Sequence, residues 1–150
     1  MELNLEKQGF KPVANPGAAI PDCVYLAKRQ TLNTNRAVCV VQLDQMPADL
    51  KVYLKSVRSR VAFKVGFFPI FWGLGLQVVL VCPGITSTTE SVLEYVAKFD
   101  NQWAIIQSVF FVDPDKWEFK AGRSWGQFLT GKYQEEIFRQ LQVTYRDVST

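Results

Sequence analysis

Residues 76–81 of this chain read Leu-Gln-Val-Val-Leu-Val and are followed directly by Cys82-Pro83-Gly84. They end an almost wholly apolar segment, Val65–Pro83, in which Gln77 is the only conventional polar side chain. A short apolar run that is rich in β-branched residues and stopped by Pro-Gly is typical of a strand buried on both faces. We therefore predict a buried strand here, in a sheet with helices packed on it.

The same segment has a second interpretation, because its length and flanks resemble a short transmembrane helix with a positive side. The basic residues that precede it are Lys51, Lys55, Arg58, Arg60 and Lys64. Pro69, Gly73 and Gly75 lie in its first eleven residues, where they would break or weaken a helix. We therefore prefer the strand and expect no membrane partner.

Hydrophobic patterns outward from this strand predict the other elements. Strand patterns cover residues 23–28, 37–43, 103–112 and 117–120, and helical patterns cover 47–61, 87–99 and a last helix after 123–124. The order β-β-α-β-α-β-β-α contains two strand–helix–strand connections, which favour parallel neighbours. It indicates a single α/β (or α+β) domain, residues 23–150, with a mixed sheet of about five strands. Residues 1–22, with three prolines, are predicted to be an irregular N-terminal arm.

Apolar spacing defines the first and last helices. The first has a spine at spacings of four, three and four, and the last has a comparable stripe. The spine is Leu50, Leu54, Val57 and Val61, and the stripe is Phe128, Leu129, Tyr133, Ile137 and Leu141. Pro47 near the first helical position and Asp49 in the first turn mark the predicted start of the first helix.

The composition excludes several classes of chemistry. The 150 residues include no histidine, so the Ser-His and Cys-His pairs of hydrolases and the commonest ligand of catalytic zinc are absent. The three cysteines are odd in number and form no CxxC, which favours buried free thiols in a reducing compartment. The N-terminus lacks the pattern of a signal peptide, and no cofactor fingerprint occurs. We expect a soluble, cytoplasmic protein without a cofactor.

The most suggestive segment for catalysis runs from Asp113 to Lys120. Glu118 and Lys120 alternate onto one strand face, and this pair with an upstream acid resembles the motif of the PD-(D/E)xK nucleases. The resemblance implies that Asp113, Asp115 and Glu118 hold Mg²⁺ while Lys120 assists an activated water. The spacing departs from the family, whose Asp lies on a separate preceding strand, so Asp100 is a further candidate. The alternative interpretation is that Glu118 and Lys120 are ordinary charged side chains on the solvent-exposed face of a strand.

Ligands of open α/β sheets collect beyond the carboxyl ends of parallel strands. Here those ends would carry Asp44, Cys82 and Asp113, which would share one crevice if the three strands are adjacent. The alternative is that each residue simply caps a turn or the following helix.

Two predicted surfaces complete the list of candidates. Trp117, Arg123 and Trp125 form a possible partner or homodimer surface, because aromatic and arginine side chains dominate interface centres. Lys51, Lys55 and Arg58 share one face of the first helix and form a possible surface for an anion or a nucleic acid.

Our leading hypothesis is a non-enzymatic binding or adaptor protein that acts through a protein–protein surface, with another protein or a second copy of the chain as its partner. The alternatives are a Mg²⁺-dependent nuclease or phosphodiesterase and an anion or nucleic-acid binder. The absence of histidine and of a cofactor fingerprint argues against an enzyme.

Overall fold

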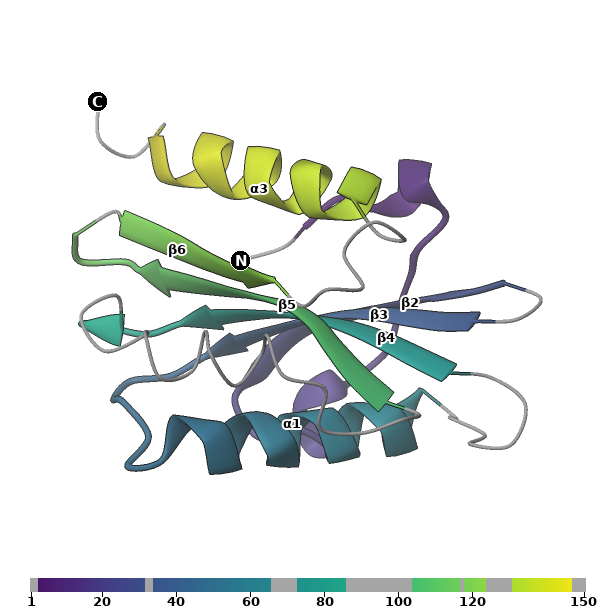
Figure 1. Ribbon diagram of the computed structural model, residues 1–150, viewed down its shortest axis with the longest axis horizontal. Coiled ribbons are helices and arrows are strands. Elements are labelled where there is room, and N and C mark those ends of the chain that lie inside the picture. The colour runs from purple at the N-terminus through teal and green to yellow at the C-terminus, as the bar shows by residue number, and fades with distance from the viewer. Residues whose placement is uncertain are drawn as a thin grey trace.

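A computed structural model describes residues 3–31, 34–65, 73–85, 104–116, 118–123 and 131–146 (Figure 1). Within these residues, six strands form one mixed sheet in the order β1-β2-β3-β4-β5-β6. The strands are β1 (Lys11–Pro12), β2 (Cys23–Gln30), β3 (Thr34–Gln42), β4 (Gly73–Val81), β5 (Ala104–Asp113) and β6 (Glu118–Arg123). The pairs β3–β4 and β4–β5 are parallel and the others antiparallel. The predicted mixed sheet is therefore confirmed.

Among the described residues, one long helix lies on each face of this sheet. Figure 1 shows α1 (Leu50–Lys64) below the sheet and α3 (Gly131–Arg146) above it. The core on the α1 side is built on Leu54, Val57 and Val61, and the core on the α3 side includes Ile137 and Leu141. These side chains belong to the predicted spine and stripe. The predicted helix at 87–99 lies outside the described residues.

Strand β4 is buried on both faces, as its sequence predicts. Leu76, Val78 and Leu80 join the core on the α1 side, whereas Val79 and Val81 join the core on the α3 side. The alternation follows from the two-residue period of a strand. Among the described residues, no helix is long and apolar enough to cross a membrane.

The start of α1 differs from the prediction. The helix begins at Leu50 rather than near Pro47, and Asp49 is its N-cap instead of a first-turn residue. One Asp49 carboxylate oxygen accepts hydrogen bonds from the backbone N–H groups of Lys51 at 2.9 Å and Val52 at 3.0 Å. Because these N–H groups have no partner within the helix, the cap fixes the starting residue.

The N-terminal arm is more regular than predicted. It contains two short 3₁₀ turns, η1 (Glu6–Gln8) and η2 (Pro16–Ala18), and the strand β1, which pairs with β2. Leu5 packs in the core on the α3 side and Ile20 in the core on the α1 side. The described part of the sheet thus has six strands, one more than the five predicted segments, because a two-residue edge strand containing proline leaves no detectable period.

Candidate functional site

The carboxyl ends of β3, β4 and β5 lie side by side. The backbone N–H of Leu43 donates to the Val81 carbonyl at 2.8 Å, and that of Cys82 donates to the Val112 carbonyl at 3.0 Å. Burial raises the pKa of the Cys82 thiol, and the nearby Asp113 and Asp44 carboxylates raise it further. This environment disfavours a thiolate, so Cys82 is poorly suited to nucleophilic chemistry.

Asp113 is fully buried, and both of its carboxylate oxygens accept hydrogen bonds from backbone N–H groups. Its Oδ2 accepts from the Gly84 N–H at 2.9 Å, and its Oδ1 accepts from the N–H groups of Asp115 at 3.1 Å and Lys116 at 3.3 Å. The carboxylate therefore joins the loop after β4 to the turn after β5. These hydrogen bonds match the alternative in which Asp113 caps a turn.

The acidic hairpin places Asp113 directly opposite Glu118 in the β5–β6 pairing. Opposite residues of antiparallel strands project from the same face, so the two carboxylates share one side of the sheet. Asp115 lies exposed in the turn, and Glu118 and Lys120 are exposed. No three His, Cys, Asp or Glu side chains of the described segments form a metal-binding group. Asp100 lies outside those segments, and the nuclease hypothesis stays a prediction.

The predicted partner surface stays untested as well. Trp117 and Trp125 lie outside the described residues, and Arg123 is described only as the last backbone position of β6.

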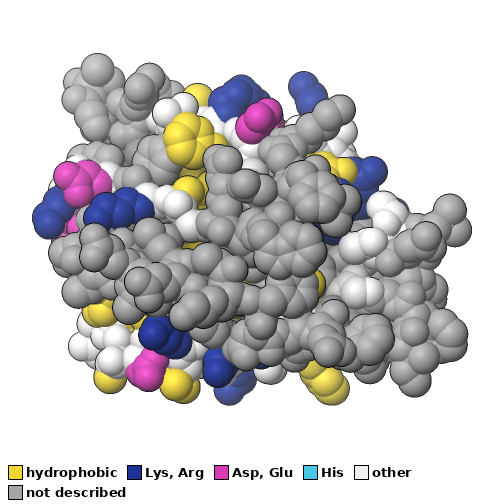
Figure 2. Space-filling view, in the orientation of Figure 1, with side chains coloured by type: hydrophobic (Ala, Val, Ile, Leu, Met, Phe, Trp, Pro, Cys, Tyr) yellow, Lys and Arg dark blue, Asp and Glu magenta, His cyan; other side chains and the backbone are white. Residues whose placement is uncertain are grey.

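The outer face of α1 combines positive charge with exposed apolar side chains. The helix has five basic residues and no acidic one, and its Lys51 and Lys55 are exposed while Arg58 is half-buried. Phe63 is 88% exposed and Val52 61% exposed. These two residues are eleven positions apart, close to three helical turns, so they lie on one stripe about 16 Å long. Figure 2 shows basic, hydrophobic and some acidic side chain atoms along the lower edge, where Figure 1 places α1.

A second unusual region was missed from the sequence: a group of polar side chains on the α3 face of the sheet. Strand register places Arg29 opposite Arg36, Arg36 beside Gly75, and Gln77 beside Ser108. We call the group the arginine–glutamine cluster; its members are Arg29, Arg36, Gln77, Gln107, Ser108 and Tyr133.

A bulge in β5 brings Gln107 into this cluster. The β4–β5 register shifts between Leu76 and Gln77, which leaves Gln107 as the extra residue. Its amide lies over Gly75, where an added Cβ would stand only 2.5 Å from Oε1. Gln107 therefore covers the sheet where Gly75 has no side chain.

Four polar atoms of the cluster are buried without a hydrogen-bond partner among the described residues. They are Arg36 Nε, Gln77 Oε1, Gln107 Oε1 and Ser108 Oγ. The exposed fractions of Gln77, Gln107 and Ser108 are 3%, 8% and 0%. Unpartnered groups at this depth are rare in folded proteins, and each calls for an explanation.

Tyr133 of α3 closes the cluster against both arginines. The Cζ atoms of Arg36 and Arg29 lie 5.0 and 5.3 Å from the centroid of its ring, within the range of cation–π contacts. Arg29 also donates to the Tyr133 hydroxyl and, at 2.7 Å, to the Gln8 carbonyl. Neither arginine forms an ion pair with a carboxylate of the described residues.

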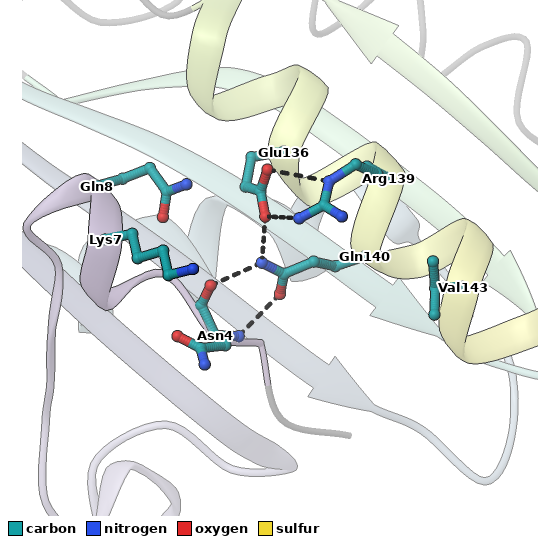
Figure 3. Close-up of a pocket in the computed structure, with 7 residues that line it drawn as sticks. All are labelled: Asn4, Lys7, Gln8, Glu136, Arg139, Gln140 and Val143. Atoms are coloured by element: carbon teal, nitrogen blue, oxygen red, sulfur yellow. Dashed lines mark hydrogen bonds and ion pairs between the residues drawn. The ribbon is translucent and has the colours of Figure 1, made fainter.

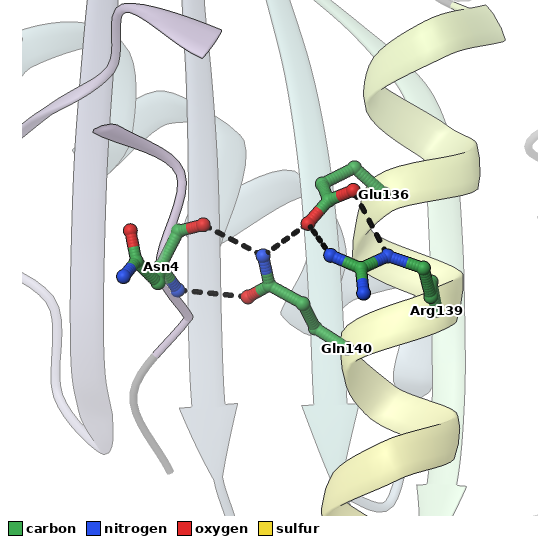
Figure 4. Close-up of polar contacts among 4 residues, drawn as sticks. All are labelled: Asn4, Glu136, Arg139 and Gln140. Carbon is green, nitrogen blue, oxygen red and sulfur yellow. Dashed lines mark hydrogen bonds and ion pairs between the residues drawn. The ribbon is translucent and has the colours of Figure 1, made fainter. Parts of the chain in front are cut away.

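A polar cavity of about 300 Å³ lies between the arm and α3 (Figure 3). Its lining residues are Asn4, Lys7, Gln8, Glu136, Arg139, Gln140 and Val143. The Gln140 amide pairs with both backbone groups of Asn4, at 2.7 and 2.6 Å, and also donates to Glu136 at 2.6 Å (Figure 4). The hydrogen bond from Arg139, and then that from Gln140, lowers the pKa of the Glu136 carboxyl. These contacts fasten the arm to α3.

Comparisons of the chain with protein-family models, with curated proteins and with solved structures find no match.

Proposed function

We propose that the protein is a non-enzymatic binding protein whose outer α1 face docks an acidic protein partner. The observation that carries this proposal is Phe63, 88% exposed on a helix with five basic residues and no acidic one. Its three free, buried cysteines fit a reducing compartment, and we infer a cytoplasmic protein.

The α1 face has the composition of an interface rather than of an ordinary solvated helix. An exposed aromatic side chain among cations resembles the residues that carry most binding energy at protein interfaces. The positive charge would speed encounter with an acidic surface, and Phe63 and Val52 would supply apolar burial along one stripe. These two contributions favour a partner that has both acidic and apolar side chains.

A second copy of this chain is a poor partner for the same face. A twofold dimer would bring the basic residues of one helix against the identical set of the other. Like charges across an interface oppose association. We therefore assign the face to a different, acidic protein.

The test measures binding of labelled peptides by fluorescence anisotropy. One peptide is an amphipathic helix of Glu and Leu, and the other has the same length and charge with Ser in place of Leu. We expect the wild type to bind the Glu–Leu peptide more tightly, and Phe63→Ser to weaken that binding about tenfold. Val143→Ser is the matched control, because Val143 is a 51% exposed apolar residue on the other helix.

Two further ligands separate this proposal from its competitors. A single-stranded DNA oligonucleotide and vesicles of phosphatidylserine present phosphates without a protein surface. Tighter binding to either one, equal affinity for the two peptides, or no effect of Phe63→Ser would refute an acidic protein partner.

A further inference from the structure

We propose that the arginine–glutamine cluster binds a small organic oxyanion that carries its own hydroxyl groups, such as a phosphorylated or carboxylated polyol. This site lies across the sheet from α1 and is independent of the partner surface proposed above.

The first step of the argument concerns charge. Arg29 and Arg36 stand directly opposite each other on antiparallel strands, an arrangement that is destabilising for two like charges. In the described part of the chain, no carboxylate forms an ion pair with either guanidinium group. The first turn of α3, which reaches the cluster through Tyr133, contains no acidic residue. Two neighbouring cations without an acidic partner among the described residues favour an anion.

The second step concerns burial. Isolated arginines on a surface are satisfied by water, but Arg36 Nε, Gln77 Oε1 and Ser108 Oγ are buried and have no hydrogen-bond partner in the part of the chain that the structure describes. Leaving such groups unpaired is unfavourable, whereas an apolar side chain at the same positions would continue the core that Val79 and Val81 form on this face. A ligand that forms hydrogen bonds with these polar side chains would remove the free-energy cost of burying them.

The third step concerns the chemical type of the ligand. Arg36 Nε is a donor, the two glutamine oxygens are acceptors, and the Ser108 hydroxyl is both. Exchanging the oxygen and nitrogen of a glutamine amide turns an acceptor into a donor, so the two glutamines suit either role. The arginines match an oxyanion, and the glutamines and the serine match neighbouring hydroxyl groups. A hydroxylated oxyanion satisfies both halves of the cluster.

The outer side chains of the cluster are partly exposed to solvent. Arg29, Arg36 and Tyr133 are only half-buried, whereas Gln77 and Ser108 lie deeper. An anion would therefore meet the guanidinium groups first and place its hydroxyl groups against the deeper side chains.

The experiment is a series of thermal melts and calorimetric titrations of the full chain. The probes are glycerol 3-phosphate, tartrate, inorganic phosphate and neutral glycerol, each at millimolar concentration and at constant ionic strength in KCl. We expect glycerol 3-phosphate or tartrate to raise the Tm by about 5 °C near saturation, inorganic phosphate to act more weakly, and glycerol to have no effect. The stronger of the first two identifies the acid group. No shift with either would overturn the proposal.

Variants then locate the binding. Arg36→Gln and Gln77→Leu should each raise the Kd about tenfold or more, because each removes a group that contacts the ligand. Lys28→Gln removes an exposed cation from the opposite face of β2, the face that carries Leu26, and should bind as the wild type does. Wild-type affinity in both cluster variants would overturn the site.

Gln77→Leu keeps the site testable if Arg36→Gln fails to fold. Since Gln77 Oε1 has no hydrogen-bond partner among the described residues, the leucine variant should melt at or above the wild-type Tm without ligand. A clearly lower Tm would show that Gln77 supports the fold, and would count against a ligand site.

Discussion

Gly75 and Gln107 share one place on the α3 face: the Gln107 amide lies 2.5 to 2.7 Å from where a Cβ of residue 75 would stand. The glycine backbone is not in the left-handed region, so the glycine is required for space rather than for conformation. The bulge in β5 therefore depends on the glycine in β4, because the Gln107 side chain occupies the space that a side chain at position 75 would need.

This relationship predicts energetic coupling between the two positions. In the wild type, Gly75→Ala should destabilise the fold by about 1 kcal/mol, because the buried Gln107 amide must move. In a Gln107→Ala background the same change should be neutral or stabilising by up to about 1 kcal/mol, because alanine restricts the unfolded chain. A double-mutant cycle by urea unfolding measures this coupling. Additive effects would contradict it.

The architecture could be predicted because each strand of the sheet core carries an apolar pattern of its own. The pattern at 76–81 predicted β4, and the strand–helix–strand connections on either side of it favoured parallel neighbours, as β3 and β5 prove to be. The β1 strand and the start of α1 could not be placed from periodicity, because pairing to β2 and the Asp49 cap determine them.

The arginine–glutamine cluster could not be predicted because its members are brought together by register. Arg29 and Arg36 belong to a hairpin, whereas Gln77 and Ser108 belong to later strands. One signal was visible: Gln77 is the only conventional polar side chain in its apolar segment. A bulge at Gln107 leaves no comparable mark in the sequence, since it appears only when β5 is aligned with β4.

The hydrogen bonds of Asp113 predict a structural role for this carboxylate. Asp113→Ala should cost about 2–4 kcal/mol, because it leaves the N–H groups of Gly84, Asp115 and Lys116 without their acceptor. Asp115→Ala, in the same turn but exposed, is the control and should change stability by less than about 0.5 kcal/mol. Chemical denaturation measures both. Equal effects of the two changes would contradict the assigned role.

The same hydrogen bonds predict the outcome of a metal test. Because both Asp113 oxygens accept from backbone, we expect millimolar Mg²⁺ or Mn²⁺ to leave the Tm unchanged in the wild type and in Glu118→Ala. A metal that bound only the folded chain would stabilise it by about 2.7 kcal/mol at one hundred times its Kd. A shift in the wild type that Glu118→Ala abolishes would instead support the nuclease hypothesis.

The contact between Gln140 and Asn4 predicts how the arm is held. Gln140→Ala removes two hydrogen bonds to the Asn4 backbone and should increase amide hydrogen exchange in residues 3–10. The expected loss of stability is about 1–2 kcal/mol. Asn4→Ala keeps the backbone contacts and serves as the control, with near wild-type exchange. Unchanged protection in Gln140→Ala would show that the other contacts of the arm, the packing of Leu5 and Phe10 and the Arg29–Gln8 hydrogen bond, are enough to hold it.

Glu136 predicts a pH dependence of stability with a definite sign. The Arg139 hydrogen bonds, at 2.6 and 3.2 Å, hold the folded-state pKa of Glu136 below its usual value of 4.5. A carboxyl whose pKa is lowered by folding stabilises the protein above the unfolded pKa, and this contribution is lost as the pH falls through the folded pKa. The wild type should therefore exceed Glu136→Gln in stability at pH 7.

Urea unfolding from pH 7 to pH 2.5 measures this difference directly. The gap between wild type and Glu136→Gln should stay constant down to about pH 5 and then close as Glu136 is protonated in both states. Glu135→Gln is the matched control, because Glu135 is the exposed neighbour on the same helix. Since the pair is near the surface, added salt should narrow the gap at pH 7. A gap that persists unchanged at pH 2.5 would assign the effect to side-chain packing rather than to charge.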